Sequence, residues 1–463
     1  MAIKKLDFFL ILLTLFLIIF IPFFLSNGGI GVDFLTYIKI ADKLPTFDEN
    51  LFPIGFPMFL RFIKILTGEY YYSSILLKVI CYLFIICFSY RYKFYFRETI
   101  ILMCLKSTIW IFVYQSSEYV GLPFLYLFLY YSHQLFIDKI NFKKYFITCT
   151  ILGFVLCTIR YANVFMFISS LVFIFFIKND TKKIKLTLFS TIASIGFLFF
   201  IYLLFNYLTL GSFASENQRV NNELDTFWFD TYVDFVGLIN LANPFFYLKT
   251  FDYLSKTKII ISFVLIFIDL IFWYLSIYIL KKNKNLFVKY LIVVALINAL
   301  FTFFSAMIQG IEPLGIRLLF NSSYLFWFAL LIIIRENNIV SDKLLYIICF
   351  VTLLYNICFI VKIPTNFISY KNAVEHIVKS KKSIPIYYYD DEKKIITTEY
   401  KVPFINKSFS YIHENKQPNY IYKAILRMVN PTIEFLDHKP SENTQKTIYS
   451  SEINNFIENK KAH

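Results

Sequence analysis

The stretch YFITCTILGFVLCTIRYANVFMFISSLVFIFFI, residues 145–177, determines how the rest of the chain is arranged. It is an apolar run of 33 residues whose one charged side chain is Arg160. As one straight helix it would be about 50 Å long, whereas the hydrocarbon core of a bilayer is only about 30 Å thick. One crossing would also put the basic run 178–185 on the same side as the acid-rich loops 27–69 and 210–256. We therefore predict two short membrane spans that turn near Arg160.

Long apolar runs recur along the chain. Of its 463 residues, 58% are hydrophobic and only 17% are charged, a balance unlike that of soluble proteins. Four further runs supply the roughly 20 residues that a helix needs to cross a bilayer. These runs are Leu6–Leu25, Ile184–Leu210, Ile259–Leu280 and Leu344–Val361. The first is too long for the apolar part of a secretory signal, so we expect it to stay as an anchor.

The runs and their polar breaks predict an all-α polytopic membrane protein with about eleven transmembrane helices. The expected spans are 7–26, 70–90, 99–115, 119–137, 145–160, 161–177, 184–209, 258–280, 286–305, 317–334 and 343–362. They form a transmembrane domain over residues 1–362. We expect residues 363–463 to form a small soluble α/β domain with a helix near 370–381, a strand near 384–389 and a poorly ordered end.

The distribution of charge indicates the orientation of the chain. The formal net charge is +15. Loops expected on one side hold 17 Lys and Arg against 5 Asp and Glu, and loops on the other side hold 7 against 13. The positive-inside rule produces this alternation, which argues against a nucleic-acid partner. We predict a multi-pass protein of the inner (plasma) membrane with a cytoplasmic N-terminus. The loops 27–69 and 210–256 and the C-terminal domain are then extracytoplasmic.

Asp33 is the leading candidate for a catalytic residue. It follows the first span, in a loop whose glycines allow the backbone to fold close to the membrane surface. A carboxylate held there could take the proton from an acceptor hydroxyl as that hydroxyl attacks the anomeric carbon of a sugar. The alternative is an ordinary solvated loop acid. Further along the loop, we expect the apolar stretch 56–66 to lie in the membrane interface.

Arg160 and Arg317 lie at the outer ends of their expected spans. The planar guanidinium of arginine forms two charge-assisted bonds to a phosphate, so both residues are candidates to bind the phosphate of a lipid-linked donor. The alternative is that each side chain extends to lipid headgroups. Glu118 lies in a very short outer turn and is a candidate for the same cavity, and a simple turn acid fits it equally well.

These residues, in this order, resemble the GT-C superfamily of polyprenyl-phosphate-sugar-dependent glycosyltransferases, which includes protein mannosyltransferases and aminoarabinose transferases. The resemblance covers most of residues 1–335 and rests on short motifs. The motifs are Asp33 with Tyr37 and Ala41-Asp42, Phe52-Pro53-Ile54-Gly55-Phe56-Pro57, Ser116-Ser117-Glu118-Tyr119, Gly153 to Arg160, and Arg317-Leu318.

The resemblance implies an enzyme that moves a hexosyl or pentosyl group from a polyprenyl-phosphate carrier to a glycan, lipid or protein acceptor of the cell envelope. It implies that Asp33 is the general base, that Arg160 or Arg317 binds the donor phosphate, and that the sugar transfers with inversion. The other candidate cavity residues are Tyr37, Asp42 and Glu118. Many members of the superfamily have a second acid beside the first, and here it is missing. We therefore predict no metal or cofactor and leave a divalent cation open.

Two other functions fit an aromatic-rich chain with this many spans. A Wzy-type polysaccharide polymerase or ligase usually concentrates arginines in a large outer loop, and the loop 210–256 has only Arg219. A non-enzymatic lipid or sugar transporter should have an internal repeat and charged residues in mid-membrane. The sequence has no evident repeat, and its main intramembrane acid is Asp269. The sugar, the acceptor and the oligomeric state stay open.

Overall fold

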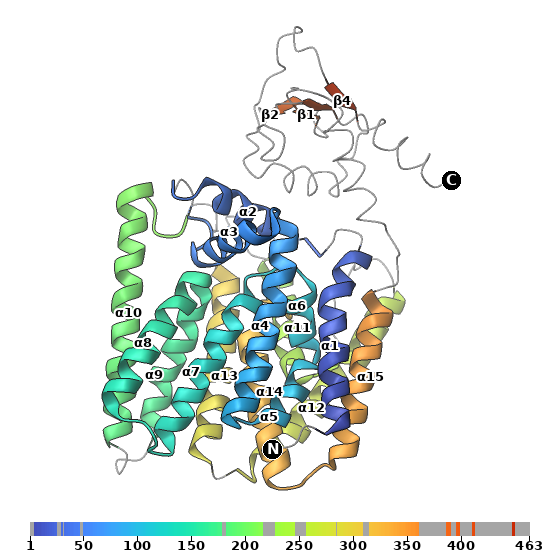
Figure 1. The fold of residues 1–463 in the computed structure, drawn as a ribbon. Coiled ribbons are helices and arrows are strands. Elements are labelled where there is room, and N and C mark those ends of the chain that lie inside the picture. Colours follow the sequence, from blue (N-terminus) through green and yellow to red (C-terminus); the bar gives the residue numbers. More distant parts are fainter. Residues whose placement is uncertain are drawn as a thin grey trace.

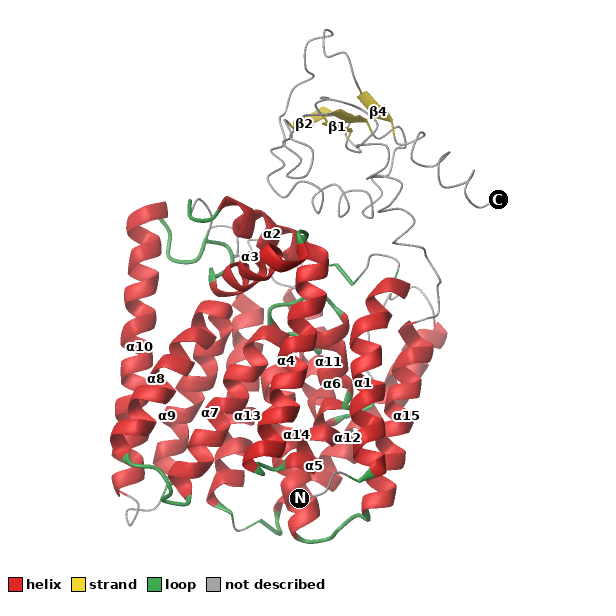
Figure 2. Ribbon diagram, viewed as in Figure 1, coloured by secondary structure: helices red, strands yellow, loops and turns green. Residues whose placement is uncertain are grey.

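The structure is a computed structural model of the 463-residue chain. It describes residues 4–25, 29–30, 32–46, 50–177, 182–215, 227–245, 256–283, 285–308 and 314–360, together with four short strands between residues 386 and 449. The described part is mostly helical, as predicted. Its helices pack side by side in a bundle (Figure 1, Figure 2).

The bounds of the helices follow the apolar runs of the sequence. The α-helices described are α1 (Lys5–Phe24), α2 (Val32–Lys43), α3 (Gly55–Thr67), α4 (Tyr70–Tyr92), α5 (Phe96–Met103), α6 (Lys106–Val113), α7 (Glu118–Phe136), α8 (Phe142–Ile159), α9 (Val164–Phe176), α10 (Lys182–Leu210), α11 (Phe227–Ile239), α12 (Lys256–Leu280), α13 (Leu286–Ile308), α14 (Phe320–Glu336) and α15 (Asp342–Ile360). Two 3-10 helices accompany them, η1 (Tyr161–Asn163) before α9 and η5 (Asn240–Ala242) after α11.

The bundle is that of a multi-pass membrane protein. Within the described residues, six helices are long and apolar enough to cross a membrane. They are Lys5–Phe23, Tyr70–Tyr92, Phe142–Ile159, Lys182–Leu210, Phe263–Leu280 and Leu286–Ile308. The outward side chains are apolar: Phe175, Phe197 and Phe267 are 85%, 64% and 65% exposed. Apolar surface of this kind is expected where side chains contact lipid instead of water.

The predicted break within residues 145–177 is confirmed. The helix α8 ends at Ile159, Arg160 has an extended backbone (φ −153°, ψ 124°), and η1 and α9 follow. The side-chain amide of Asn163 donates a hydrogen bond to the carbonyl of Leu156 (2.7 Å). The same carbonyl also accepts the backbone N–H of Arg160 (3.1 Å), so both residues after the break are held against the last turn of α8.

The structure corrects the continuous helix expected over 99–115. α5 ends at Met103 and α6 begins at Lys106, so the chain bends inside the bundle. α11 is also short, and after η5 the backbone at Asn243 is extended. Non-helical backbone within a membrane-spanning bundle is stable where surrounding protein buries it. The backbone N–H of Lys106 donates to the carbonyl of Pro244 (3.2 Å), which joins the two breaks.

α14 forms the centre of the bundle. Nearly every side chain from Phe320 to Ile334 is buried, and α14 packs against α13, α5, α6 and α12. A helix that is apolar on all sides requires neighbours on all sides. Because Arg317 lies just before α14, the central helix also fixes where this arginine emerges.

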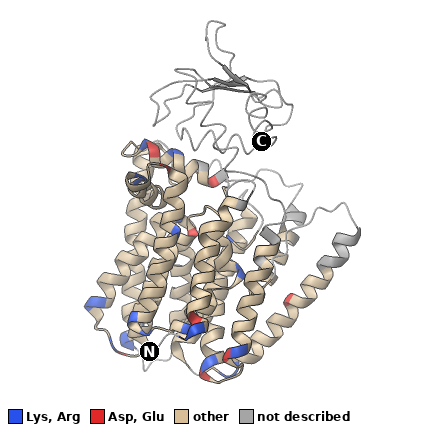
Figure 3. Cartoon of the chain, turned by 45° about the vertical axis from the view of Figure 1, so that its right-hand side comes forward, with Lys and Arg blue, Asp and Glu red and all other residues tan. Residues whose placement is uncertain are grey.

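The two ends of the bundle differ in charge. We call the end where α1 begins the basal end and the opposite end, where α2 and α3 lie, the distal end (Figure 1). Figure 3 shows Lys and Arg gathered at the basal end. At the distal end, α3 is a 13-residue helix with Met58, Phe62 and Ile65 exposed. It is too short to span a bilayer, as predicted for residues 56–66.

Four short strands are described near the end of the chain. β1 (Ile386–Tyr389), where the sequence predicts a strand, pairs antiparallel with β2 (Ile395–Thr398). β3 (Ser410–Ile412) pairs in parallel with β4 (Thr447–Tyr449). The helix expected near 370–381 lies outside the described residues, and so does Arg219.

Candidate functional site

A cavity of about 530 Å³ lies at the distal end of the bundle. Its lining comes from α2, α7, α9, α10 and α13 and from the segments next to α8 and α14. The charged side chains in the lining are Asp33, Glu118, Arg160 and Arg317. Segments far apart in the sequence therefore bring two carboxylates and two guanidinium groups to one cavity.

Asp33 and Arg317 form a direct ion pair. Arg317 Nη1 lies 2.6 Å from Asp33 Oδ2, and each side chain is about one third exposed. Asp33 is in the first turn of α2. The partial positive charge at a helix N-terminus favours a carboxylate there. The pair is therefore close enough for a strong hydrogen bond and open enough for a ligand to reach it.

Glu118 and Arg160 form a second, more buried pair. Arg160 Nη1 lies 2.7 Å from Glu118 Oε1, with 15% and 4% of the two side chains exposed. Glu118 begins α7 and Arg160 directly follows α8, so each charge lies at the helix end whose dipole favours it. Arg317 Nε lies 3.9 Å from Glu118 Oε1, which links the two pairs into one row.

The two arginines are also joined through the backbone. Arg160 Nη1 donates to the carbonyl of Arg317 (3.2 Å). Asn163, which caps α8, accepts a hydrogen bond from the side chain of Asn321 (2.7 Å), in the first turn of α14. The end of α8 is thus tied to the start of α14. Asn163 was not predicted from the sequence, although a small polar residue just after a helix break is a recognisable capping signal.

Tyr37 lines the cavity as a hydrogen-bond donor. It is 4% exposed, and its hydroxyl donates to Ser117 Oγ (3.2 Å). Burial raises the pKa of Tyr37 above its ordinary value, and the hydrogen bond to Ser117 only partly opposes this. Its ring packs against Phe52 and Phe56 at centroid distances of 4.6 and 4.8 Å. The phenol is therefore fixed in place and stays protonated at neutral pH.

The structure places Asp42 outside this cavity. Its carboxylate accepts hydrogen bonds from Lys64 Nζ (2.8 Å) and Tyr70 Oη (3.0 Å), which join α2 to α3 and α4. Asp42 follows Asp33 by about two and a half helical turns, so the two acids point to opposite sides of α2. Asp42 therefore joins helices at the distal end and does not line the cavity.

One wall of the cavity is apolar. Val164 and Phe165 of α9 and Phe199 and Leu203 of α10 form it. Each of these side chains comes from a helix of the bundle, not from a loop. The cavity therefore has a charged side at the distal surface and an apolar side toward the membrane-spanning helices.

The segment 50–53 covers the cavity and is held in place by hydrogen bonds. Leu51, Phe52 and Pro53 line the cavity. The buried side chain of Asn50 donates to the carbonyl of Ser212 (2.6 Å) and accepts from the hydroxyl of Ser215 (2.6 Å). The segment 50–53 is thus attached to the residues that follow α10.

Known proteins do not identify this site. No protein-family model, no curated protein and no solved structure matches the chain. Within the described residues, no group of three His, Cys, Asp or Glu side chains could hold a metal ion. We therefore infer the function of the cavity from the chemistry of the residues that line it.

Proposed function

We propose that the protein is a membrane glycosyltransferase that moves a sugar from a polyprenyl-phosphate carrier to a cell-envelope acceptor, with Asp33 as general base. The pairing of Asp33 with Arg317, in a cavity with a second acid–arginine pair and an apolar wall, carries this proposal. The reaction needs a base for the acceptor hydroxyl, cations for the phosphate and apolar surface for the lipid. The cavity combines all three.

The ion pairs explain how the cavity can exist without donor. Two partly buried arginines without counter-charges would be costly, and the two carboxylates balance their charge. A phosphate accepts two parallel hydrogen bonds from a guanidinium, so it can replace Asp33 at Arg317 when the donor binds. This exchange leaves the Asp33 carboxylate beside the sugar with no strong cation on it, and an unpaired carboxylate is the better base.

In the proposed step, the acceptor hydroxyl gives its proton to Asp33 while its oxygen bonds to the anomeric carbon. The bond between that carbon and the phosphate oxygen breaks, and the electron pair leaves with the polyprenyl phosphate. Arg160 and Arg317 stabilise the negative charge that builds on the leaving phosphate. Attack from the side opposite the phosphate inverts the anomeric carbon.

The apolar wall supports a lipid-linked donor over a soluble one. Its residues lie on α9 and α10, and α9 packs against both α10 and α13. A carrier chain lying against these helices stays within apolar surroundings while its phosphate reaches the two arginines. A nucleotide-sugar would bring no chain to fill this side of the cavity.

We further propose about eleven spans with the cavity on the outer face of the inner membrane. Beyond the six long apolar helices, the other spans are α7, α9, α14, α15 and the α5–α6 pair. The Lys and Arg at the basal end (Figure 3) support a cytoplasmic basal end by the positive-inside rule. In this arrangement residues 363–463 form an extracytoplasmic domain.

The decisive experiment compares Asp33→Asn with Asp42→Asn in purified, reconstituted protein. Sugar transfer from a polyprenyl-phosphate-linked donor to a membrane extract should fall by about 10² to 10⁴ in Asp33→Asn, the contribution of a general base. Asp42→Asn changes an acid of the same helix that lies outside the cavity, so transfer should be retained. Equal transfer by wild-type protein and Asp33→Asn would show that Asp33 is not the base.

Transport is a second candidate function, favoured by one observation. The buried Lys106 and Asp269 are linked through Asn240 where α5–α6 and α11–η5 are broken, and transporters bind substrate at such breaks. The cavity beside Lys106 has a volume of about 10 Å³, room for about one water. Because no sugar fits there, we favour the enzyme. Movement of labelled donor lipid across vesicles without any new glycoside would favour transport.

A further inference from the structure

Two glycines touch the backbone just before the two cavity arginines. A Cβ atom added to Gly55 would lie 2.6 Å from the carbonyl oxygen of Thr158, two residues before Arg160. A Cβ added to Gly237 would lie 2.0 Å from the carbonyl oxygen of Leu314, three residues before Arg317. Real Cβ atoms essentially never approach closer than 3.0 Å. Because the opposing atoms are backbone, no side-chain rotation can relieve these contacts.

The contact at Gly237 is reinforced by a hydrogen bond. One turn earlier on α11, Asp234 Oδ1 accepts from the backbone N–H of Leu314 (2.7 Å), and Leu314 is completely buried. Residues 315–319 then turn directly into α14, with Phe320 N–H donating to the carbonyl of Arg317 (3.3 Å). A shift of Leu314 is therefore passed on to Arg317.

α11 itself is held in place by buried hydrogen bonds at its end. At its end, Asn240 and Asn243 donate to the carboxylate of Asp269 on α12 (2.8 and 2.6 Å). Lys106 Nζ donates to Asn240 Oδ1 (2.6 Å), which adds α6 to the same cluster. All four side chains are buried. The intramembrane charges considered for transport thus hold the helix that carries Asp234 and Gly237.

Gly55 makes the corresponding contact with the backbone just before Arg160. It is the first residue of α3, and its added Cβ would also lie 2.9 Å from the amide nitrogen of Ile159. The preceding residue is fixed as well, because the N–H of Ile54 donates to the hydroxyl of Tyr202 on α10 (3.2 Å). α3 therefore rests on the end of α8, where Arg160 follows.

We propose that Gly55 and Gly237 are positioning residues that set the placement of Arg160 and Arg317 for the donor phosphate, an inference that rests on the proposed glycosyltransferase function. Each glycine lets a neighbouring helix lie directly on the backbone that leads to an arginine. The two arginines are joined on the cavity side by the bond from Arg160 Nη1 to the Arg317 carbonyl (3.2 Å) and by Glu118, and the glycine contacts support the backbone behind each of them.

Gly55→Ala and Gly237→Ala test this proposal, with Gly196→Ala as the matched control. Gly196 lies within α10 and has no atom within 4 Å of an added Cβ. Alanine favours helix, so the change itself does not weaken α3, α10 or α11. Gly55→Ala and Gly237→Ala each force a shift of the backbone that leads to an arginine, and a misplacement on the order of 1 Å can cost about 10²-fold in kcat/KM. We expect the donor KM to rise at least tenfold, with kcat less affected.

The control should keep both constants within twofold of wild type. If all three variants keep the wild-type donor KM, the glycines do not position the arginines. If Gly237→Ala does not fold, Asp234→Ala replaces it. Asp234→Asn keeps an acceptor for the Leu314 N–H, so it should retain the wild-type donor KM that Asp234→Ala loses. If both Asp234 variants show the same donor KM, the hydrogen bond to Leu314 does not position Arg317.

A second measurement does not depend on sugar transfer. Thermal unfolding of Asp33→Asn, Arg317→Gln and the double variant gives the coupling between the two side chains. We expect this coupling in wild-type and Gly196→Ala backgrounds and its loss in Gly237→Ala. If wild-type protein transfers no sugar but the coupling pattern holds, the proposed function fails and the positioning stands. If the coupling survives in Gly237→Ala, the positioning fails.

Discussion

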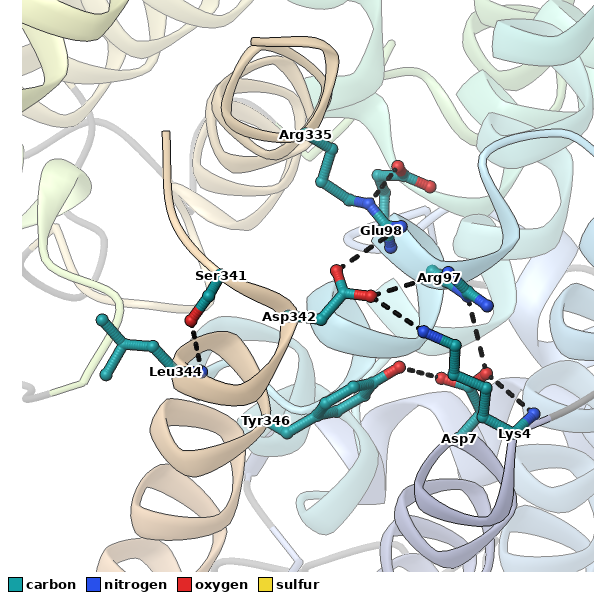
Figure 4. Close-up of polar contacts among 9 residues, drawn as sticks. All are labelled: Lys4, Asp7, Arg97, Glu98, Arg335, Ser341, Asp342, Leu344 and Tyr346. Atoms are coloured by element: carbon teal, nitrogen blue, oxygen red, sulfur yellow. Dashed lines mark hydrogen bonds and ion pairs between the residues drawn. The ribbon is translucent and has the colours of Figure 1, made fainter. Parts of the chain in front are cut away.

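Each end of the bundle carries a cluster of ion pairs with balanced charge, and the two clusters differ in what they enclose. The distal cluster of Asp33, Glu118, Arg160 and Arg317 borders a cavity of about 530 Å³. The basal cluster (Figure 4) consists of Lys4, Asp7, Arg97, Glu98, Arg335, Asp342 and Tyr346. We call the second group the basal network.

The basal network uses its charges to join helices. Asp342 at the start of α15 pairs with Lys4 (3.0 Å), Arg97 (3.6 Å) and Arg335 (3.6 Å). Asp7 of α1 is 1% exposed and accepts hydrogen bonds from the hydroxyl of Tyr346 and, at 3.2 Å, from the backbone N–H of Lys4. α1, α5, α14 and α15 therefore meet through one set of polar contacts (Figure 4).

The comparison shows that residue types alone do not distinguish a functional site from a set of contacts that joins helices. Both clusters pair carboxylates with arginines at helix ends, where the helix dipole favours them. In the basal network each acid contacts partners from other helices, and these contacts stabilise packing. In the distal cluster the same groups border open volume, so an incoming phosphate can replace a carboxylate. Substitutions at the two ends should therefore affect different measurements.

The largest expected effect comes from Arg317→Gln, compared with Arg335→Gln. Loss of the distal arginine removes a charge from the leaving phosphate, and sugar transfer should fall by about 10²-fold or more. Arg335→Gln removes an arginine from the basal network and should lower the melting temperature while transfer per folded molecule is retained. Transfer rates normalised to monodisperse protein check both. Similar losses of transfer in the two variants would remove the functional difference between the clusters.

Asp7→Asn should have the next largest effect, on stability alone. The nearly buried carboxylate loses its charge-assisted bond to Tyr346 and its attraction to Arg97, whose Nε lies 3.7 Å away. A hydrogen bond to a charged group contributes about 2 kcal/mol, so thermal unfolding should show a loss of this size. Glu118→Gln is the matched distal variant, and unlike Asp7→Asn it should reduce transfer per folded molecule as well as stability. Unchanged unfolding of Asp7→Asn would mean that the basal network does not hold α1 to α15.

Much of the fold could be predicted from the sequence because the bilayer restricts it. The turn at Arg160 followed from comparing the length of one apolar run with the bilayer thickness, and α8 does end at Ile159. The break between Met103 and Lys106 could not be predicted, since no Gly or Pro lies in 99–115. It depends on a distant partner, the carbonyl of Pro244.

The candidate site could be predicted only in part. Charge patterns placed Asp33, Glu118, Arg160 and Arg317 on one side of the membrane, and the structure brings them to one cavity. Asp42 was a candidate through the family resemblance, and it lies outside the cavity because the helical period of α2 turns the two acids apart. Contacts such as Gly237 on Leu314 join residues far apart in sequence and leave no local pattern.

The smallest expected effect is that of Lys183→Gln, which tests whether burial separates Asp7 of the basal network from ordinary surface charge. Lys183 Nζ lies 2.9 Å from Asp138 Oδ1 at the same basal end, with the two side chains 64% and 78% exposed. Exposed pairs contribute roughly 0 to 1 kcal/mol, because water and salt screen them. Thermal unfolding of Lys183→Gln should therefore differ from wild type by less than about 0.5 kcal/mol, and transfer should be unchanged. If Lys183→Gln destabilises the protein as much as Asp7→Asn, charge at the basal end matters wherever it lies, and the burial of Asp7 is not what makes it important.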